Sequence, residues 1–178
     1  MKIINTNILG LKVITSTKFS DSRGEFRELF RKNTSGTKKE FKFTCYSKSK
    51  KNVLRGLHLQ TSYAQAKYVT VIKGSILDVA VDLRQGSKTY KKYFKIILSS
   101  ENCKSIFIPK GFAHGFLSLD KENIIVYHLS NYRSKKNEVG IKWNEKILGI
   151  NWGIKKPILS EKDATKNISL LDYEKKYN

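Results

Sequence analysis

Between about residues 41 and 132, hydrophobic and polar positions alternate with a period of two, which is the pattern of half-buried β-strands. Segments rich in valine, isoleucine, tyrosine and phenylalanine are separated by glycine, serine, asparagine and lysine. The predicted strands cover residues 67–73, 75–83, 93–98, 105–108, 112–119 and 124–130. Many short strands, spaced by roughly eight to twelve residues, are typical of a β-sandwich or a small β-barrel.

The segment 75–83 shows the alternation over its whole length. Its odd-numbered positions from 77 to 83 are leucine or valine and share one face of the predicted strand. Asp78 and Asp82 lie on the other face with Ile76 and Ala80, so two carboxylates are expected to point the same way.

The two ends of the chain are less regular. The first eight residues predict an initial strand, and residues 37–42 allow a short helix. The tail after Gly140 is predicted to form loops and short turns, with Trp143 and Trp152 packing it back onto the β-structure. We therefore expect residues 1–178 to form a single, mainly β domain with short peripheral helices or turns.

Composition restricts the class of protein further. The hydrophobic content is 39%, and no apolar run approaches the length of a membrane span. The N-terminus lacks the long apolar region of a signal peptide, which favours the cytoplasm. Cys45 and Cys103 lie far apart in the sequence and are expected to be buried or half-buried free thiols in a reducing compartment.

The formal net charge of +20 would ordinarily favour nucleic-acid binding. The lysines, however, are spread over the chain and cluster locally only as pairs at turn-like positions. No arginine-rich tract, zinc-ligand spacing or aromatic nucleic-acid-binding motif accompanies them. We therefore expect no nucleic acid as the main partner, although the charge could steer a polyanionic small substrate.

Two of the three histidines occur in glycine-marked motifs. Asn52-Val-Leu-Arg-Gly-Leu-His-Leu-Gln60 puts Arg55 and His58 on either side of a Gly-Leu step. Pro109-Lys-Gly-Phe-Ala-His114 brings a second histidine into a strand after a turn. Together the two motifs predict a polar site inside the β-structure.

Two imidazoles from different strands are too few ligands for a catalytic metal, and Gln60 stands two residues after His58 instead of a further histidine. The remaining polar residues suit acid–base chemistry, with His58 as base, Tyr127 as acid and Lys67 stabilising an oxyanion. Taken singly, His58 and Tyr127 could equally be core residues and Lys67 an exposed one. Their combination favours a catalytic site.

Seven blocks in order resemble the dTDP-4-dehydrorhamnose 3,5-epimerase family, the cupin-fold nucleotide-sugar epimerases. The resemblance runs from about Thr17 to Leu171. The blocks are 21–28 (DSRGEFRE), 52–60 (NVLRGLHLQ), 64–67 (AQAK), 78–84 (DVAVDLR), 108–116 (IPKGFAHGF), 127–132 (YHLSNY) and 159–163 (LSEKD). The resemblance implies a cupin or jelly-roll β-barrel.

The family's chemistry needs no cofactor, because the ketone of a nucleotide-linked 4-keto-6-deoxy sugar acidifies the protons on C3 and C5. By resemblance, His58 is the base that removes these protons, and Asp163 supports its charged form. Lys67 holds the enolate oxygen, and Tyr127 returns a proton from the opposite face. The product would feed deoxysugar synthesis for surface polysaccharide.

Other positions match the family's substrate contacts. They are Arg23, Phe26, Glu28, Arg55, His114, Glu138 and Lys162. Asp82 and Arg84 are instead expected to form a structural ion pair. The resemblance further implies a homodimer in which an N-terminal segment crosses between subunits, so that Arg23 or Glu28 could serve the neighbouring subunit's site.

The chain departs from the family at three places. Phe43-Thr44-Cys45 stands where members carry a Gln-x-Asn that contacts the nucleotide, and Tyr132-Arg133 stands where they carry two tyrosines. Thr61-Ser-Tyr63 replaces a proline-rich turn. The alternatives are therefore a single-centre epimerase or ketoisomerase on a related nucleotide sugar, or a non-catalytic sugar-binding cupin.

Overall fold

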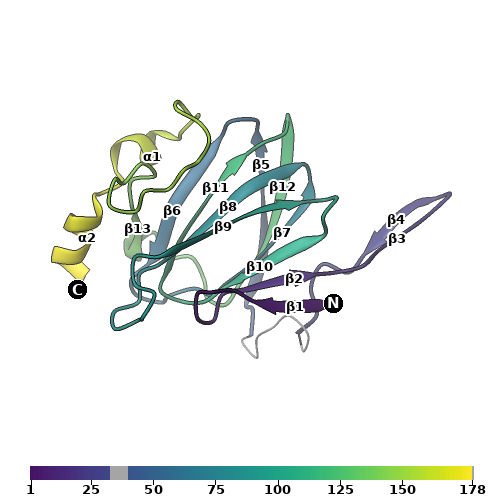
Figure 1. The fold of residues 1–178 in the computed structure, drawn as a ribbon, viewed down its shortest axis with the longest axis horizontal. Coiled ribbons are helices and arrows are strands. Elements are labelled where there is room, and N and C mark those ends of the chain that lie inside the picture. The colour runs from purple at the N-terminus through teal and green to yellow at the C-terminus, as the bar shows by residue number, and fades with distance from the viewer. Residues whose placement is uncertain (33–39, 178) are drawn as a thin grey trace.

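The computed structural model describes residues 1–32 and 40–177, in which two antiparallel sheets pack face to face (Figure 1). Within these residues, the larger sheet has the strand order β1 (Lys2–Asn5), β2 (Lys12–Thr15), β10 (Lys104–Ile108), β7 (Lys67–Lys73), β12 (Glu122–Leu129) and β5 (Phe43–Lys50). The smaller sheet has the order β13 (Glu138–Gly140), β6 (Leu54–Gln60), β11 (Phe112–Ser118), β8 (Ser75–Asp82) and β9 (Tyr93–Ser99).

The predicted mainly β fold is confirmed, as is each of the six predicted strands, with small differences at their ends. The architecture is a two-sheet sandwich of the jelly-roll kind. Over the described residues, no strand of one sheet pairs with a strand of the other, so the expected barrel is not closed.

The inner core fills part of the space between the two sheets. Its buried side chains are Ile8, Leu11, Val69, Val71, Ile76, Ala80, Leu98, Ile106, Ile108, Phe112, Phe116 and Ile125. The alternation predicted for β8 is confirmed, because Ile76 and Ala80 face this core while Val79 and Val81 face away from it.

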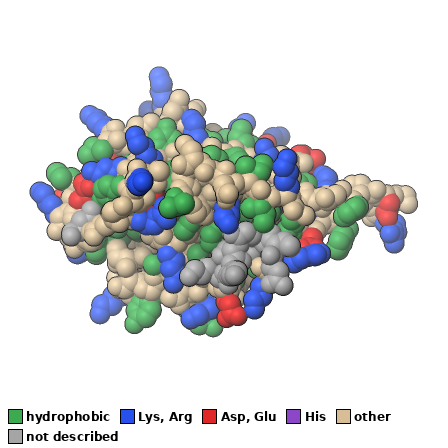
Figure 2. Space-filling model, turned by 60° about the horizontal axis from the view of Figure 1, so that its bottom comes forward, with side chains coloured by type: hydrophobic (Ala, Val, Ile, Leu, Met, Phe, Trp, Pro, Cys, Tyr) green, Lys and Arg blue, Asp and Glu red, His purple; other side chains and the backbone are tan. Residues whose placement is uncertain are grey.

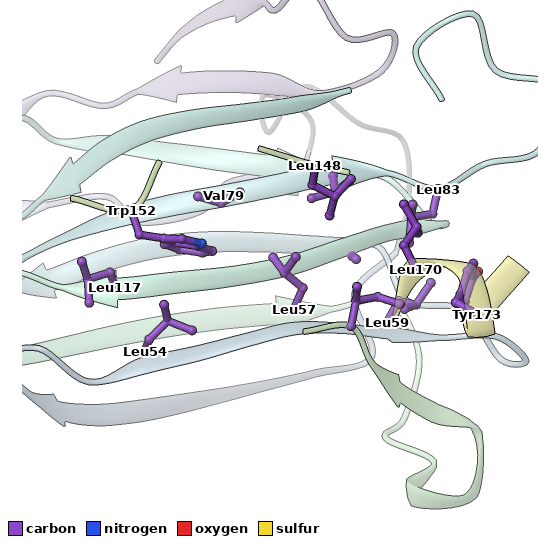
Figure 3. Close-up of a cluster of buried hydrophobic side chains, with 13 residues drawn as sticks. Leu54, Leu57, Leu59, Val79, Leu83, Leu117, Leu148, Trp152, Leu170 and Tyr173 are labelled. Atoms are coloured by element: carbon purple, nitrogen blue, oxygen red, sulfur yellow. The ribbon is translucent and has the colours of Figure 1, made fainter. Parts of the chain in front are cut away.

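The opposite face of the smaller sheet is covered by the C-terminal tail (Figure 3). Buried side chains of β6, β8 and β11 pack there against Ile141, Leu148, Trp152, Leu170 and Tyr173, and this cluster is the outer core. Trp143 packs against it as well, and its carbonyl accepts a 2.8 Å hydrogen bond from the Trp152 indole. Both tryptophans therefore attach the tail to the sheet, as predicted.

The tail is more regular than the sequence indicated. After the 3₁₀ turn Lys135–Asn137 it forms α1 (Glu161–Thr165) and α2 (Leu170–Tyr177). Ser160 caps α1 by accepting a hydrogen bond from the backbone N–H of Asp163. Both helices are too short to show a strong helical period in the sequence. The possible helix at 37–42 falls partly outside the described residues, and residues 40–42 are not helical.

A two-stranded hairpin of β3 (Lys18–Asp21) and β4 (Gly24–Arg27) projects away from the sandwich (Figure 1). Its Phe19 and Phe26 side chains are exposed. In Figure 2 the hairpin is the narrow extension on the right, and lysine and arginine side chains are scattered over the visible face.

Both cysteines are free thiols, as predicted. Cys103 is buried as expected, but Cys45 is exposed, because it lies on the edge strand β5 of the larger sheet. The longest helix among the described residues falls far short of what a membrane crossing requires.

Candidate active site

A cavity of about 540 Å³ opens between the two sheets and is bounded on one side by α1. Its walls carry eight of the eleven residues that the sequence marked as catalytic or substrate-binding. These are Arg55, His58, Lys67, His114, Tyr127, Glu138, Lys162 and Asp163.

A β-bulge in β6 turns both polar residues of the first histidine motif into this cavity. His58 pairs with His114 of β11 and Arg55 pairs with Phe116, so two residues of β6 oppose the single Gly115. In a regular strand, Arg55 and His58 would point to opposite faces. Gly56 is required there, because its φ is +129° and an added Cβ would lie 2.5 Å from the Cα of Gly115.

His58 and Asp163 form a short, direct contact in the cavity wall. The Nε2 atom of His58 lies 2.6 Å from Oδ1 of Asp163, whose side chain is 4% exposed. Burial alone would raise the pKa of Asp163, but hydrogen bonding and the charge of His58 hold it below its usual value. Asn167 adds a 3.4 Å contact to the same oxygen. This geometry suits a base whose charged form is stabilised by a carboxylate.

Lys67 and Tyr127 face His58 from the larger sheet. Burial lowers the pKa of Lys67 to about 8, opposed by the charges of Glu138 and Asp78. Its Nζ donates to the backbone carbonyl of His58 at 3.4 Å. Burial also raises the pKa of Tyr127, whose hydroxyl lies 2.9 Å from the Ser47 hydroxyl. At neutral pH the cavity therefore holds a largely protonated amine and a neutral phenol.

His114 forms a second histidine–carboxylate pair. Its Nε2 lies 2.8 Å from Oδ2 of Asp78, and both side chains are buried. Burial lowers the pKa of His114 despite the opposing charge of Asp78, so the ring is neutral near pH 7.

Glu138 joins two cations in the cavity wall. Arg133 donates from Nε and from its terminal amine at 2.8 and 3.0 Å, and Lys162 contacts the same carboxylate. Burial acts to raise the pKa of Glu138, but these partners lower it to about 2. Glu138 is therefore an anion at neutral pH and is not poised to act as a base.

Three of the residues that depart from the family pattern belong to the same cavity. Phe43, Cys45 and Arg133 line it. Phe43 also stacks on Tyr132, with ring centroids 5.7 Å apart. Where amides and an aromatic pair were expected, the wall carries an aromatic ring, a thiol and a guanidinium.

Arg23, Phe26 and Glu28 are not brought to this cavity within the chain. Arg23 forms an ion pair with Asp21 in the projecting hairpin, and Phe26 is 70% exposed there. Glu28 pairs with Arg31 just beyond the hairpin. The predicted structural pair of Asp82 and Arg84 is confirmed, with hydrogen bonds of 2.7 and 2.8 Å, outside the cavity.

Sequence reasoning missed the partners that hold the chemical groups in place. Asp78, Ser47 and Asn167 contact His114, Tyr127 and Asp163 respectively. Of these three, only Asp78 could be noticed in the sequence, because a carboxylate is unusual on the strand face that also carries Ile76 and Ala80. Within residues 1–32 and 40–177, no group of three or more His, Cys, Asp or Glu is arranged to hold a metal ion.

Comparisons with known proteins agree on one family. The sequence model described as dTDP-4-dehydrorhamnose 3,5-epimerase matches residues 5–170. The dTDP-4-dehydrorhamnose 3,5-epimerase of Shigella flexneri is 43% identical over 168 residues, which cover 92% of this chain and 93% of the relative.

Solved structures agree in fold over nearly the whole chain. The crystal structure of dTDP-4-dehydrorhamnose 3,5-epimerase from Elizabethkingia anophelis is 37% identical with a TM-score of 0.88, covering 100% of this chain and 99% of the other. The dTDP-6-deoxy-D-glucose-3,5-epimerase of Legionella pneumophila, in complex with dTDP-4-keto-L-rhamnose, is 39% identical with a TM-score of 0.89, covering 96% and 93%.

Proposed function

The chain belongs to the dTDP-4-dehydrorhamnose 3,5-epimerase family, and we propose that it inverts C3 and C5 of dTDP-4-keto-6-deoxyglucose to give dTDP-4-keto-rhamnose. The reaction serves deoxysugar synthesis for surface polysaccharide. The main support from the site is the arrangement of His58 and Tyr127 on facing walls of one cavity. Inversion needs a proton to leave one face of the sugar ring and another to arrive on the opposite face.

His58 is the base in this mechanism. Its imidazole takes the proton from C3 or C5, and the buried Asp163 carboxylate at 2.6 Å stabilises the imidazolium that forms. The electrons of the broken C–H bond move into the ketone at C4, which becomes an enolate. Positioned acid–base catalysis of this kind typically contributes ~10²–10⁴-fold.

Lys67 and Tyr127 complete the cycle. With a pKa of about 8, Lys67 is largely an ammonium at neutral pH and can stabilise the enolate oxygen. Tyr127 keeps its proton until the enolate is formed, because burial raises its pKa. It then protonates the carbon from the side opposite His58. Before the next inversion, His58 releases its proton to solvent and the Tyr127 phenolate takes one from solvent. Arg55, His114, Glu138 and Lys162 bind the substrate around these groups.

Tyr127→Phe separates removal of the proton from inversion. The variant should still exchange substrate hydrogen for solvent deuterium through His58, while formation of the epimerised product falls by ~10² or more. Both rates can be followed by NMR in heavy water. Tyr93→Phe is the control, since the Tyr93 hydroxyl lies outside the cavity, against the carbonyl of Gly149. Equal inversion by Tyr127→Phe and the wild type would remove Tyr127 from the acid role.

The same assay can identify which nucleoside the sugar substrate carries. Phe43 and Cys45 replace two amides, and Arg133 replaces an aromatic residue. We propose thymidine, supported by the ligand named in the Legionella pneumophila structure. A parallel assay with the uridine analogue tests this choice. Label at one carbon alone would identify a single-centre epimerase, and binding without label would identify a non-catalytic cupin.

The active unit in this proposal is a homodimer in which the β3–β4 hairpin reaches the partner's cavity. The hairpin projects from the sandwich and exposes Phe19 and Phe26, while β1 leaves Ile3 and Ile4 exposed. Arg23 and Phe26 would thereby meet a substrate that they cannot reach in their own chain. A guanidinium suits the diphosphate.

Mixing two inactive variants tests this arrangement. In a mixed dimer, the Arg23→Ala subunit keeps His58 in its cavity, and a crossing hairpin from the His58→Asn subunit supplies Arg23 to that cavity. One of the two sites is then intact. After subunit exchange, about a quarter of the wild-type activity should return, because half of the dimers are mixed and each has one intact site. A hairpin that serves its own subunit gives no recovery.

The cellular setting follows from the chemistry. Two free thiols and a nucleotide-sugar substrate support a cytoplasmic enzyme. We propose that residues 1–178 act as one epimerase domain, since the family match extends over residues 5–170.

A further inference from the structure

Asp78 is a buried carboxylate bonded to His114, a residue of the cavity wall, and the reaction described above gives it no role. It lies on β8, next to β11, and is fully buried. Its Oδ2 is 2.8 Å from Nε2 of His114. Its Oδ1 has no hydrogen-bond partner among the residues that the structure describes.

Burying Asp78 in this way lowers the stability of the fold, which suggests a role in the site. A buried carboxylate with an unpaired oxygen loses its hydration without full compensation. The neighbouring positions on the same face of β8, Ile76 and Ala80, pack into the inner core without such a cost. An apolar residue at 78 would continue that pattern, so stability alone does not explain the aspartate.

The first consequence of Asp78 is the state of His114. Burial and the nearby charge of Lys67 keep the ring neutral, so only one of its nitrogens carries a hydrogen. A carboxylate 2.8 Å from Nε2 holds that hydrogen on Nε2. Nδ1 is then a hydrogen-bond acceptor on a ring that lines the cavity, directly across the strands from His58.

The second consequence of Asp78 is a negative charge near the ammonium group of Lys67. The titratable or charged groups around Lys67 are Glu138 on β13, Asp78 on β8, Cys45 on β5, His114 on β11, His58 on β6 and Tyr127 on β12. Glu138 is already shared between Arg133 and Lys162, and Asp163 is paired with His58. Asp78 is the remaining carboxylate whose charge acts on Lys67.

We infer that Asp78 is a positioning residue for the epimerase reaction. It fixes His114 as a hydrogen-bond acceptor for a hydroxyl of the sugar, and its charge supports the ammonium of Lys67 beside the developing enolate. The inference rests on the proposed function, because it assigns Asp78 to the same reaction.

The pH dependence of kcat/KM for Asp78→Asn tests the role of the charge. Asparagine keeps the size of the side chain and removes the charge that opposes the effect of burial on Lys67, so the alkaline limb should move to lower pH. A shift of ~1 unit lowers kcat/KM about tenfold more above that limb than well below it, where only the loss of the contact with His114 acts. A profile that superimposes on the wild type would overturn the inference.

Asp82→Asn is the matched control, because Asp82 is equally buried on the same strand but bonds Arg84, Ser87 and Thr89 outside the cavity. It should lose stability without a shift in the pH profile. A purely structural Asp78 would behave in the same way.

Nitrogen-15 NMR of the wild-type imidazoles provides a second test that requires neither a folded variant nor turnover. His114 should be protonated at Nε2 and bare at Nδ1 from pH 7 to 9. A hydrogen on Nδ1, or a charged ring, would overturn the inference. If the wild type labels no substrate in heavy water, the proposed function fails, and the NMR result still decides whether Asp78 fixes His114.

Discussion

Asp163→Asn is the substitution whose effect can be worked most fully from the geometry. The carboxylate lies 2.6 Å from His58 Nε2, and its side chain is almost completely buried. A hydrogen bond to a charged group contributes ~1.5–3 kcal/mol, and here it grows in strength as His58 gains a proton. If the whole of that energy is expressed in the transition state, kcat/KM falls roughly ten- to 150-fold at ~1.4 kcal/mol per factor of ten.

The assay is the initial rate of deuterium entry at C3 and C5, measured at low and at saturating substrate. Glu161→Gln is the control, because Glu161 is an exposed carboxylate in the first turn of the same helix. It removes one negative charge without touching His58, and its rate should match the wild type. Thermal unfolding confirms that both variants are folded. An Asp163→Asn rate within threefold of Glu161→Gln would refute a supporting role for Asp163.

Three further predictions concern stability. Hydrogen bonds lower the pKa of Asp82 to about 2 in spite of burial, so its contribution is complete above pH ~4 and is lost as pH falls through about 2. Asp82→Asn should therefore cost ~2 kcal/mol at pH 7 and much less at pH 2, as measured by urea unfolding. Gly56→Ala should lower stability by ~2 kcal/mol or more, since the added Cβ meets Gly115 at 2.5 Å; an unchanged melting temperature would contradict the bulge. Trp152→Ala should cost ~3–5 kcal/mol, because it empties the centre of the outer core, and a loss below 1 kcal/mol would mean that the tail is not anchored there.

The sandwich was predictable because its strands obey simple alternation. In β8, leucine and valine on one face meet the outer core, and Ile76 and Ala80 on the other meet the inner core. The tail was less predictable. Both helices are short, and α1 depends on the Ser160 cap and on contacts with β6 that are distant in sequence.

Some features of the site were predictable from the sequence, and others depend on contacts between distant segments. Arg55 and His58 were visible as a pair, but the bulge that turns both into the cavity depends on Gly115 in another strand. Asp163 lies 105 residues from His58, and only the family resemblance linked the two. Asp78 shows the limit most clearly, because its position on β8 was predicted but its partner His114 follows from strand order.

The projecting hairpin carries predicted substrate contacts that do not reach the cavity of their own chain. Arg23 and Phe26 were marked as substrate contacts and lie outside the cavity of their own chain. No periodicity within one sequence reports which molecule a hairpin will contact. Mixing His58→Asn with Arg23→Ala tests directly whether the hairpin reaches the partner's cavity.

The central claim is that His58 removes the protons at C3 and C5 of a nucleotide-linked 4-keto sugar. The most direct test is NMR of dTDP-4-keto-6-deoxyglucose in heavy water with the wild type and with His58→Asn. We predict deuterium at both carbons with the wild type and at neither with the folded variant. Exchange by His58→Asn at the wild-type rate would contradict the assignment of the base, and a wild type that labels neither carbon would contradict the proposed reaction.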